Sequence, residues 1–172
     1  GKLQMQTMAL DGQNYRDVLG GLLQIQRPMG ENGQIAAFTQ LSQLRYDSQQ
    51  PRDADRTTFG IAYSQALETR FSPSFYASLY QGQEQVTNDQ FDYFSQSFTG
   101  IRVGGSLAYS QTLALNAHLS LEQRDYDKAN QFLPFTGARE DSETGLTLGL
   151  TWLFKPKYSL QPFYTYSNNN AN

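Results

Sequence analysis

The sequence predicts an all-β protein, an antiparallel up-and-down β-barrel of the kind that spans a membrane with its strands. Three observations support this class. Apolar and polar residues alternate with a period of two over most of the chain. The alternating segments are long, and the connections between them appear sorted by length. At 172 residues the chain suits one domain, so we expect residues 1–172 to form a single barrel segment.

Composition excludes several other classes. The chain has no Cys and one His, so we expect no disulfide framework and no metal site, and nothing in it points to a cofactor. The formal net charge is −3 and no basic cluster appears, which argues against a nucleic-acid partner. No apolar run approaches the length of a transmembrane helix. An aromatic content of 13% is too high for a disordered chain.

In the first part of the chain, Lys2–Leu10 is a plausible first strand. In the next segment Leu19, Leu23 and Ile25 share one face, opposite Gln24 and Gln26. Residues 34–46 are ambiguous, because Ile35, Ala37 and Leu41 keep one parity whereas Leu44 and Tyr46 have the other. A β-bulge would explain that switch, so we expect one there.

The remaining strands follow the same alternation. It predicts strands over residues 57–68, 75–84, 97–110, 113–126, 143–154 and 158–166, which makes about nine in all. The pattern is clearest in Glu143–Phe154, where large apolar residues alternate with Gly and Thr. A helix is disfavoured there, because each interior Gly costs about 1 kcal/mol relative to Ala.

Strand length and loop length both favour a membrane barrel. Strands in soluble domains usually have about 5–6 residues, whereas a strand that crosses a bilayer needs roughly 9–11. Short connections are expected near residues 28–33, 69–74, 111–112 and 155–157, and long ones near 11–15, 47–54, 86–96 and 127–141. This strict alternation is typical of outer-membrane barrels, in which short periplasmic turns alternate with longer external loops.

The distribution of side chains between the two faces is inverted relative to a soluble barrel. The large apolar residues share one face, and no helix or second sheet is evident to cover it, so we expect that face to contact the lipid bilayer. Six aromatic residues cluster beside the short turns, as a membrane-interface girdle would: Trp152, Phe154, Tyr158, Phe71, Phe75 and Tyr109. An odd number of strands cannot close with antiparallel pairs alone, so we expect a fragment of a larger barrel.

The opposite face is expected to line the lumen. Its charged and polar candidates are Arg102, Glu122, Arg124, His118, Asn116, Glu68 and Glu84. The charged members could form a constriction that selects solutes, or a ladder of cross-strand ion pairs that fills the interior. The exposed aromatic residues Phe132 and Phe135, in the loop 128–140, could contact a partner or simply pack within the loop.

His118 and Ser120 form a His-x-Ser pair, with Asn116 on the same face. The pair is similar to that of outer-membrane phospholipase A, in which the His activates the Ser hydroxyl as a base. In that family the pair faces the lipid, whereas here Leu119 and Leu121 occupy the lipid face. We therefore expect no catalytic residues and no enzyme.

The C-terminal segment carries a more specific resemblance. Leu160–Asn172 reads Leu-Gln-Pro-Phe-Tyr-Thr-Tyr-Ser-Asn-Asn-Asn-Ala-Asn. It resembles the penultimate strand and loop of the C-terminal barrel in the surface lipoprotein assembly modifier family. The resemblance implies a barrel in the bacterial outer membrane that follows a periplasmic tetratricopeptide domain and moves lipoproteins to the cell surface. In that family one further strand with an aromatic end follows, and this chain shows neither that strand nor a helical repeat.

These observations lead to several expected functions. The first is export or translocation of protein, a lipoprotein, across the outer membrane of a Gram-negative bacterium. Its expected partners are the exported lipoprotein and a periplasmic helical-repeat domain. The second is a passive or substrate-selective porin for small solutes. A lipid hydrolase that depends on His118 is a third, and a soluble β-sandwich or adhesin is the alternative outside the membrane.

Overall fold

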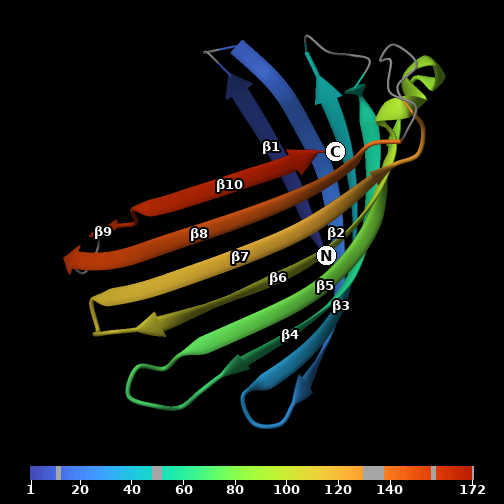
Figure 1. Cartoon of the computed structure of the whole chain (residues 1–172). Coiled ribbons are helices and arrows are strands. Elements are labelled where there is room, and N and C mark those ends of the chain that lie inside the picture. Colours follow the sequence, from blue (N-terminus) through green and yellow to red (C-terminus); the bar gives the residue numbers. More distant parts are fainter. Residues whose placement is uncertain (11–12, 48–51, 130–137, 156–157, 172) are drawn as a thin grey trace.

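The computed structural model describes residues 1–10, 13–47, 52–129, 138–155 and 158–171, with the backbone alone for residues 2–10, 13–15 and 155. These residues form one antiparallel sheet (Figure 1). Its strands are β1 (Lys2–Leu10), β2 (Gln13–Met29), β3 (Gly33–Tyr46), β4 (Ala54–Ala66), β5 (Ser74–Val86), β6 (Gln96–Ala108), β7 (Leu113–Tyr126), β8 (Glu140–Lys155), β9 (Tyr158–Leu160) and β10 (Phe163–Ala171). A short 3₁₀ helix, η2 (Asp89–Phe94), lies between β5 and β6.

The strands follow one another in up-and-down order, as the alternation predicts. Neighbours in the sheet are neighbours in the chain from β1 to β8, and β9 and β10 both pair with β8. The last two strands occupy one position in the sheet, interrupted at Gln161 and Pro162. Proline has no amide N–H, but the Pro162 carbonyl accepts from the Leu150 amide at 3.0 Å and keeps the segment aligned.

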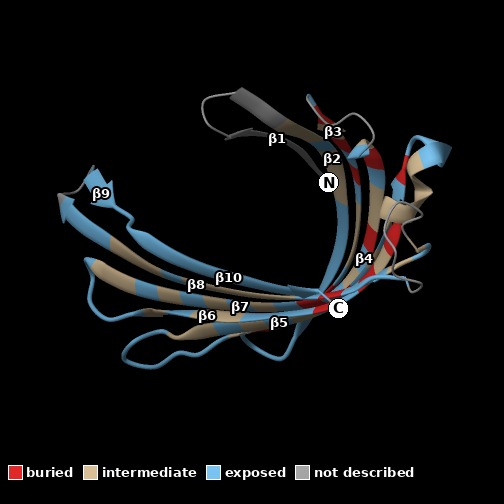
Figure 2. Ribbon diagram, turned by 45° about the horizontal axis from the view of Figure 1, so that its top comes forward, coloured by how far each residue is buried: buried red, intermediate tan, exposed pale blue. Residues whose placement is uncertain are grey.

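The sheet is strongly curved and open (Figure 2). Within the described residues, the edge strands β1 and β10 do not pair with each other. The expectation of an all-β antiparallel up-and-down sheet is therefore confirmed, whereas a closed barrel is not observed.

The β-bulge expected in β3 is absent, and that prediction was wrong. The register runs without a shift from Arg16–Tyr46 to Met29–Gly33 on one side of β3, and from Gly33–Gln65 to Leu44–Ala54 on the other. Leu44 and Tyr46 are instead buried apolar residues on the concave face. Leu44 is in register with Ala54, and Ala54 with Val86, so an apolar row closes this end of the concave face. Along β3 the concave face becomes apolar toward Tyr46, while the same alternate residues point to that face throughout the strand.

Two rims bound the sheet, and we name them by what they carry. The η2 rim holds the connections that follow β3, β5 and β7, and the turn rim holds those that follow β2, β4, β6 and β8 (Figure 1). The predicted strict alternation of loop lengths was wrong. The first connection consists only of residues 11–12, which lie outside the described residues, because polar residues from Gln13 onward continue β2. Residues 47–53 and 67–73 form connections of equal length on opposite rims.

Burial follows the curvature of the sheet. In β5 every second residue is exposed, including Phe75, Ala77 and Leu79, while the residues between them are covered. The covered residues lie on the concave face, where side chains crowd together. Buried residues gather toward the η2 rim, and they include Tyr46, Ala54, Tyr80, Val86 and Phe98 (Figure 2).

Candidate functional site

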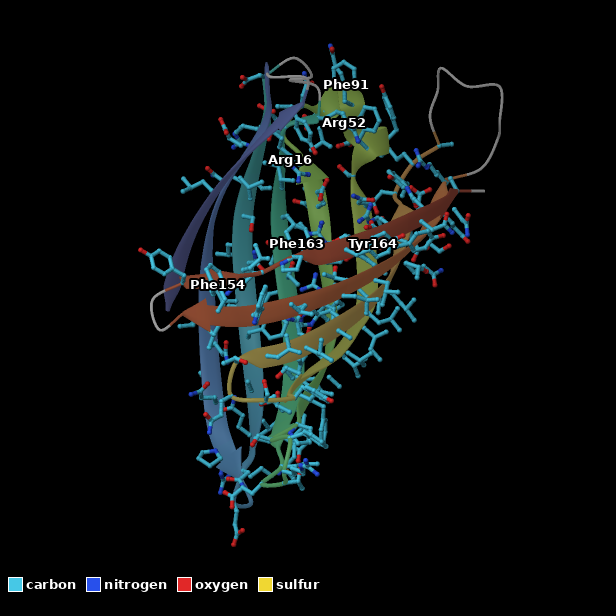
Figure 3. The ribbon with its side chains drawn as sticks, turned by 90° about the vertical axis from the view of Figure 1, so that its left-hand side faces the viewer. Arg16, Arg52, Phe91, Phe154, Phe163 and Tyr164 are labelled. Carbon is cyan, nitrogen blue, oxygen red and sulfur yellow. The ribbon has the colours of Figure 1, made fainter. Side chains whose placement is uncertain are left out.

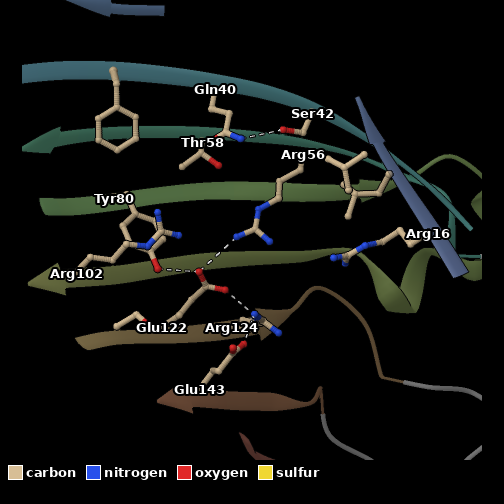
Figure 4. Close-up of a pocket in the computed structure, with 14 residues that line it drawn as sticks. Arg16, Gln40, Ser42, Arg56, Thr58, Tyr80, Arg102, Glu122, Arg124 and Glu143 are labelled. Atoms are coloured by element: carbon tan, nitrogen blue, oxygen red, sulfur yellow. Dashed lines mark hydrogen bonds and ion pairs between the residues drawn. The ribbon is translucent and has the colours of Figure 1, made fainter. Parts of the chain in front are cut away.

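A cluster of charged side chains occupies the concave face between β4 and β8. We call Arg56, Tyr80, Glu84, Glu122, Arg124 and Glu143 the charged cluster, and Figure 4 shows all of them except Glu84. Register places Tyr80 on β5, Glu122 on β7 and Glu143 on β8 in one row across the sheet, with Gly100 of β6 between the first two. The strands thus bring together residues that lie far apart in the sequence.

Glu122 is the centre of this cluster. It is 9% exposed, and the Tyr80 hydroxyl donates to its carboxylate at 2.9 Å. Arg124 donates from Nε at 2.7 Å, and Arg56 from a terminal nitrogen at 3.4 Å. A buried carboxylate is tolerated only when charged partners and hydrogen bonds compensate for its lost hydration, and all three donors do so here.

Arg56 and Arg124 each join two carboxylates. Arg56 also contacts Glu84 at 3.4 Å, and Arg124 also donates to Glu143. Glu122 and Glu143 are direct cross-strand neighbours, a placement that would be destabilising for two like charges without a cation between them. Arg124 supplies that cation. This arrangement corresponds to the ion-pair ladder, the second of the two interpretations expected for this face.

Two of the guanidinium groups make cation–π contacts with aromatic rings. The Arg56 guanidinium lies 3.9 Å from the centroid of the Phe98 ring, and that of Arg102 lies 4.3 Å from the centroid of Tyr80. Arg102 was expected beside Glu122 and Arg124. In the described part of the chain it forms no ion pair within 4.0 Å, and its guanidinium lies over the Tyr80 ring instead.

Glycines make room for these rings. A Cβ at Gly100 would overlap the Tyr80 ring, and one at Gly82 would meet Phe98. Gly60 faces Phe38 in the same way, and Gly104 faces Tyr76. Each pair joins neighbouring strands on the concave face. Sequence reasoning missed these pairs, because they become visible only when the register is known.

A pocket of about 300 Å³ opens on the charged cluster. It reaches from β2 to β8 and is lined by Arg16, Val18, Phe38, Gln40, Arg56, Arg102, Glu122, Arg124 and Glu143, among others. Arg16 was not among the expected lumen residues. It lies at the start of β2, where the apolar alternation had not yet begun, so the sequence pattern gave no indication of it.

The three polar residues of the predicted His-x-Ser group lie on the concave face but make separate contacts. The His118 ring nitrogen Nδ1 lies 2.9 Å from the Tyr76 hydroxyl. The Ser120 hydroxyl donates to the Gly145 carbonyl at 3.4 Å, and the Asn116 side chain lies against Gly149. In this arrangement the Ser120 proton is directed to a backbone carbonyl, which cannot act as a general base.

The two expected lumen glutamates have different positions. Glu84 lies on the concave face and pairs with Arg56, as its parity predicts. The placement of Glu68 was wrong. β4 ends at Ala66, and Glu68 lies exposed in the connection that follows, where it accepts from the Asn32 side chain at 3.0 Å. Thr69 to Ser72 turn the chain here, so the alternating pattern does not extend to Glu68.

The six predicted interface aromatics all lie at the turn rim and are exposed. Phe71 stacks on Tyr109 with the ring centroids 6.0 Å apart. Trp152, Phe154 and Tyr158 form a second group with successive centroids 5.7 and 6.1 Å apart. Phe75 lies 6.3 Å from Tyr63. Figure 3 shows Phe154 at this rim, far from Arg52 and Phe91 at the η2 rim.

Ion pairs and cation–π contacts join neighbouring segments of the chain at the η2 rim. Arg52 lies over the rings of Tyr46 and Phe94, at 5.5 and 5.4 Å from their centroids. Lys128 contacts Asp92 at 2.7 Å, and this hydrogen bond raises the pKa of Lys128. Arg139 donates to Asp141, which raises the pKa of Arg139. The loop aromatics Phe132 and Phe135 lie outside the described residues.

Comparisons of the chain with protein-family models, with curated proteins and with solved structures find no match. Among the described residues, no helix is long and apolar enough to cross a membrane. In the described ranges, no three His, Asp or Glu side chains lie close enough together to hold a metal ion.

Proposed function

We propose that this chain forms the wall of a transmembrane β-barrel in the outer membrane of a Gram-negative bacterium, and that its concave face lines a passage. The observation that carries the proposal is the inverted burial of the sheet. Apolar side chains are exposed on the convex face, and polar and charged ones are covered on the concave face. Lipid would cover the convex face and water would fill the concave side.

Strand length supports this proposal. The strands from β3 to β8 have 13 to 16 residues. At about 3.3 Å per residue, the shortest of them extend roughly 43 Å. A strand tilted by about 45° would then cross roughly 30 Å, which is the thickness of the hydrocarbon core.

The convex face supports it as well. Ile25, Ile61 and Leu79 are 74%, 55% and 55% exposed. They lie in one row across the sheet, with Ala37 between Ile25 and Ile61, and Ile101 continues the row beyond Leu79. Soluble monomers rarely expose apolar patches larger than a few hundred Å². In the described residues no second sheet lies against this face. A soluble β-sandwich would need such a cover.

We favour an exported protein as the substance that passes through the barrel. The resemblance of Leu160–Asn172 to surface lipoprotein assembly modifiers supports this choice, with an exported lipoprotein and a periplasmic helical-repeat domain as partners. A pore selective for small solutes is the second candidate, and the charged pocket on the concave face favours it. We do not propose a lipid hydrolase, because Ser120 and His118 make hydrogen bonds to other groups.

Refolding into lipid tests the barrel proposal. The full chain would be diluted from urea into buffer alone and into phosphatidylcholine vesicles. Trp152, the one tryptophan of the sequence, reports on the turn rim. We expect a blue-shifted Trp152 emission, a β-sheet circular dichroism spectrum and co-flotation with the vesicles. A chain that folds as a soluble monomer in buffer and does not float with vesicles would contradict the proposal.

A further inference from the structure

The geometry points to an anion-binding site in the concave pocket, in which Arg16 holds the oxygens of a carboxylate or phosphate group between Arg56 and Arg124. The site goes beyond the proposed function, because it concerns a ligand that the barrel class does not specify. It also stands independently of whether protein or solute uses the passage.

The charge of the pocket favours an anion. Four arginines line it, namely Arg16, Arg56, Arg102 and Arg124, against two glutamates, Glu122 and Glu143. Adding Glu84, which pairs with Arg56 behind the lining, still leaves one positive charge in excess. The whole chain has a net charge of −3, so this positive region is local to the pocket. A concave surface of one sign concentrates counter-ions of the other.

The pairing within the pocket leaves Arg16 without an anion. Both lining carboxylates are bound by Arg56 and Arg124. Arg16 forms no ion pair with any described residue, and its guanidinium carbon lies 5.9 Å from the centroid of the Tyr46 ring. Its Nε is buried without a hydrogen-bond partner in the described part of the chain. A buried donor left without an acceptor is unfavourable by roughly 1–3 kcal/mol, and an oxyanion would supply the acceptor.

The directions of the side chains define the site. Figure 4 shows the Arg16 guanidinium reaching toward the space between Arg56 and Arg124. Three guanidinium groups that face one space repel one another unless a negative charge lies between them. Glu122 already pairs with Arg56 and Arg124, so it does not neutralise Arg16. A guanidinium presents paired N–H donors that match the oxygens of a carboxylate or phosphate.

The lining also limits the size and character of the ligand. The volume of about 300 Å³ admits a small organic anion. Val18, Phe38 and Leu44 give one part of the wall an apolar surface, which suits a ligand with a carbon body beside its charged group. The pocket opens on the concave face, away from the apolar convex face, so we assign it to a water-soluble ligand rather than to a lipid headgroup.

Calorimetric titration tests the site. The full chain, folded in zwitterionic detergent micelles, would be titrated with inorganic phosphate and, separately, with acetate. We expect both to bind, with an affinity that falls as salt is added. Arg16→Gln should weaken phosphate binding at least tenfold, and Arg16→Lys, which retains the charge, should weaken it less. Arg27→Gln is the matched control, because Arg27 is an exposed arginine of the same strand that does not line the pocket; it should change the affinity less than threefold.

Each other outcome overturns the assignment in a distinct way. Equal affinities of wild type and Arg16→Gln would remove Arg16 from the site. A wild-type chain with a β-sheet spectrum and no phosphate binding at millimolar concentration would refute the anion site and leave the barrel proposal intact. Displacement of phosphate by phosphatidylglycerol added to the micelles would assign the pocket to a lipid headgroup instead of a soluble anion.

Discussion

At the residue scale, Glu122 determines how the concave face is held together. It accepts hydrogen bonds from three side chains on β4, β5 and β7, and the residue is only 9% exposed. Removing its charge would leave Arg56 with Glu84 alone and Arg124 with Glu143 alone. The energetic effect comes from the loss of a buried charged acceptor that three side-chain donors share, because each guanidinium still keeps one carboxylate.

We predict that Glu122→Gln lowers the free energy of unfolding by about 1.5–3 kcal/mol, because the Tyr80 hydroxyl and two guanidinium groups lose a charged acceptor. Urea titration of the protein folded in phosphatidylcholine vesicles, followed by Trp152 fluorescence, measures this change. Glu143→Gln is the control, because the Glu143 side chain is 35% exposed, and it should cost about 1 kcal/mol or less. Equal losses in the two variants would show that Glu122 is not the centre of the network.

Sequence reasoning identified part of this site. Parity placed Glu84, Asn116, His118, Glu122 and Arg124 on one face, and the structure agrees. It could not reveal that Arg102 lies over Tyr80, since that contact depends on side-chain reach across a glycine. Arg16 was missed because curvature brings β2 to the same pocket as β7 and β8, and curvature is not encoded in a local pattern.

At the scale of the elements, glycine and aromatic residues join neighbouring strands. Gly100 of β6 lies opposite Tyr80 of β5, and Gly82 of β5 lies opposite Phe98 of β6. The two pairs are reciprocal, so each strand supplies one ring and one glycine to the other. The rings occupy the space that a Cβ on the facing glycine would fill, and the guanidinium groups of Arg56 and Arg102 lie over them.

We predict that Gly100→Ala destabilises the folded protein by about 1–3 kcal/mol, because the added methyl group forces the Tyr80 ring out of place. The combined variant Gly100→Ala with Tyr80→Leu should lose less than the sum of the single changes, as contacting residues do. Gly21→Ala is the control, since nothing lies within 4 Å of the Cβ it would add. Urea unfolding measures all four. A Gly100→Ala variant as stable as Gly21→Ala would refute this role for the ring.

The alternation of apolar and polar residues predicted which segments form strands and in which order they pair, but it did not predict where each strand begins and ends. The start of β2 at Gln13 lies in polar sequence, where backbone pairing continues although apolar residues do not alternate. β4 ends at Ala66 although Leu67 continues the alternation, because the chain turns over the following residues. The apparent parity switch in β3 has a different origin. On β3, β4 and β5 the concave face carries an apolar row near the η2 rim, so Leu44 and Tyr46 belong there without a bulge.

At the scale of the whole molecule, curvature separates two environments. It turns the polar residues of β2 to β8 toward one another and leaves the apolar residues on an open convex face. The aromatic groups at the turn rim follow the border of that face. Such a sheet in water would expose its apolar face, whereas in a bilayer each face would meet a matching environment.

Site-specific labelling across one strand tests this account most directly. The chain has no cysteine, so single cysteines can be placed at 145 to 152 of β8 without interference. They would be probed with a water-soluble maleimide in isolated outer membranes of cells that express the chain. The account predicts labelling at Gly145→Cys, Thr147→Cys, Gly149→Cys and Thr151→Cys, and protection at Leu146→Cys, Leu148→Cys, Leu150→Cys and Trp152→Cys. Equal labelling on both faces would contradict a lipid-covered convex surface.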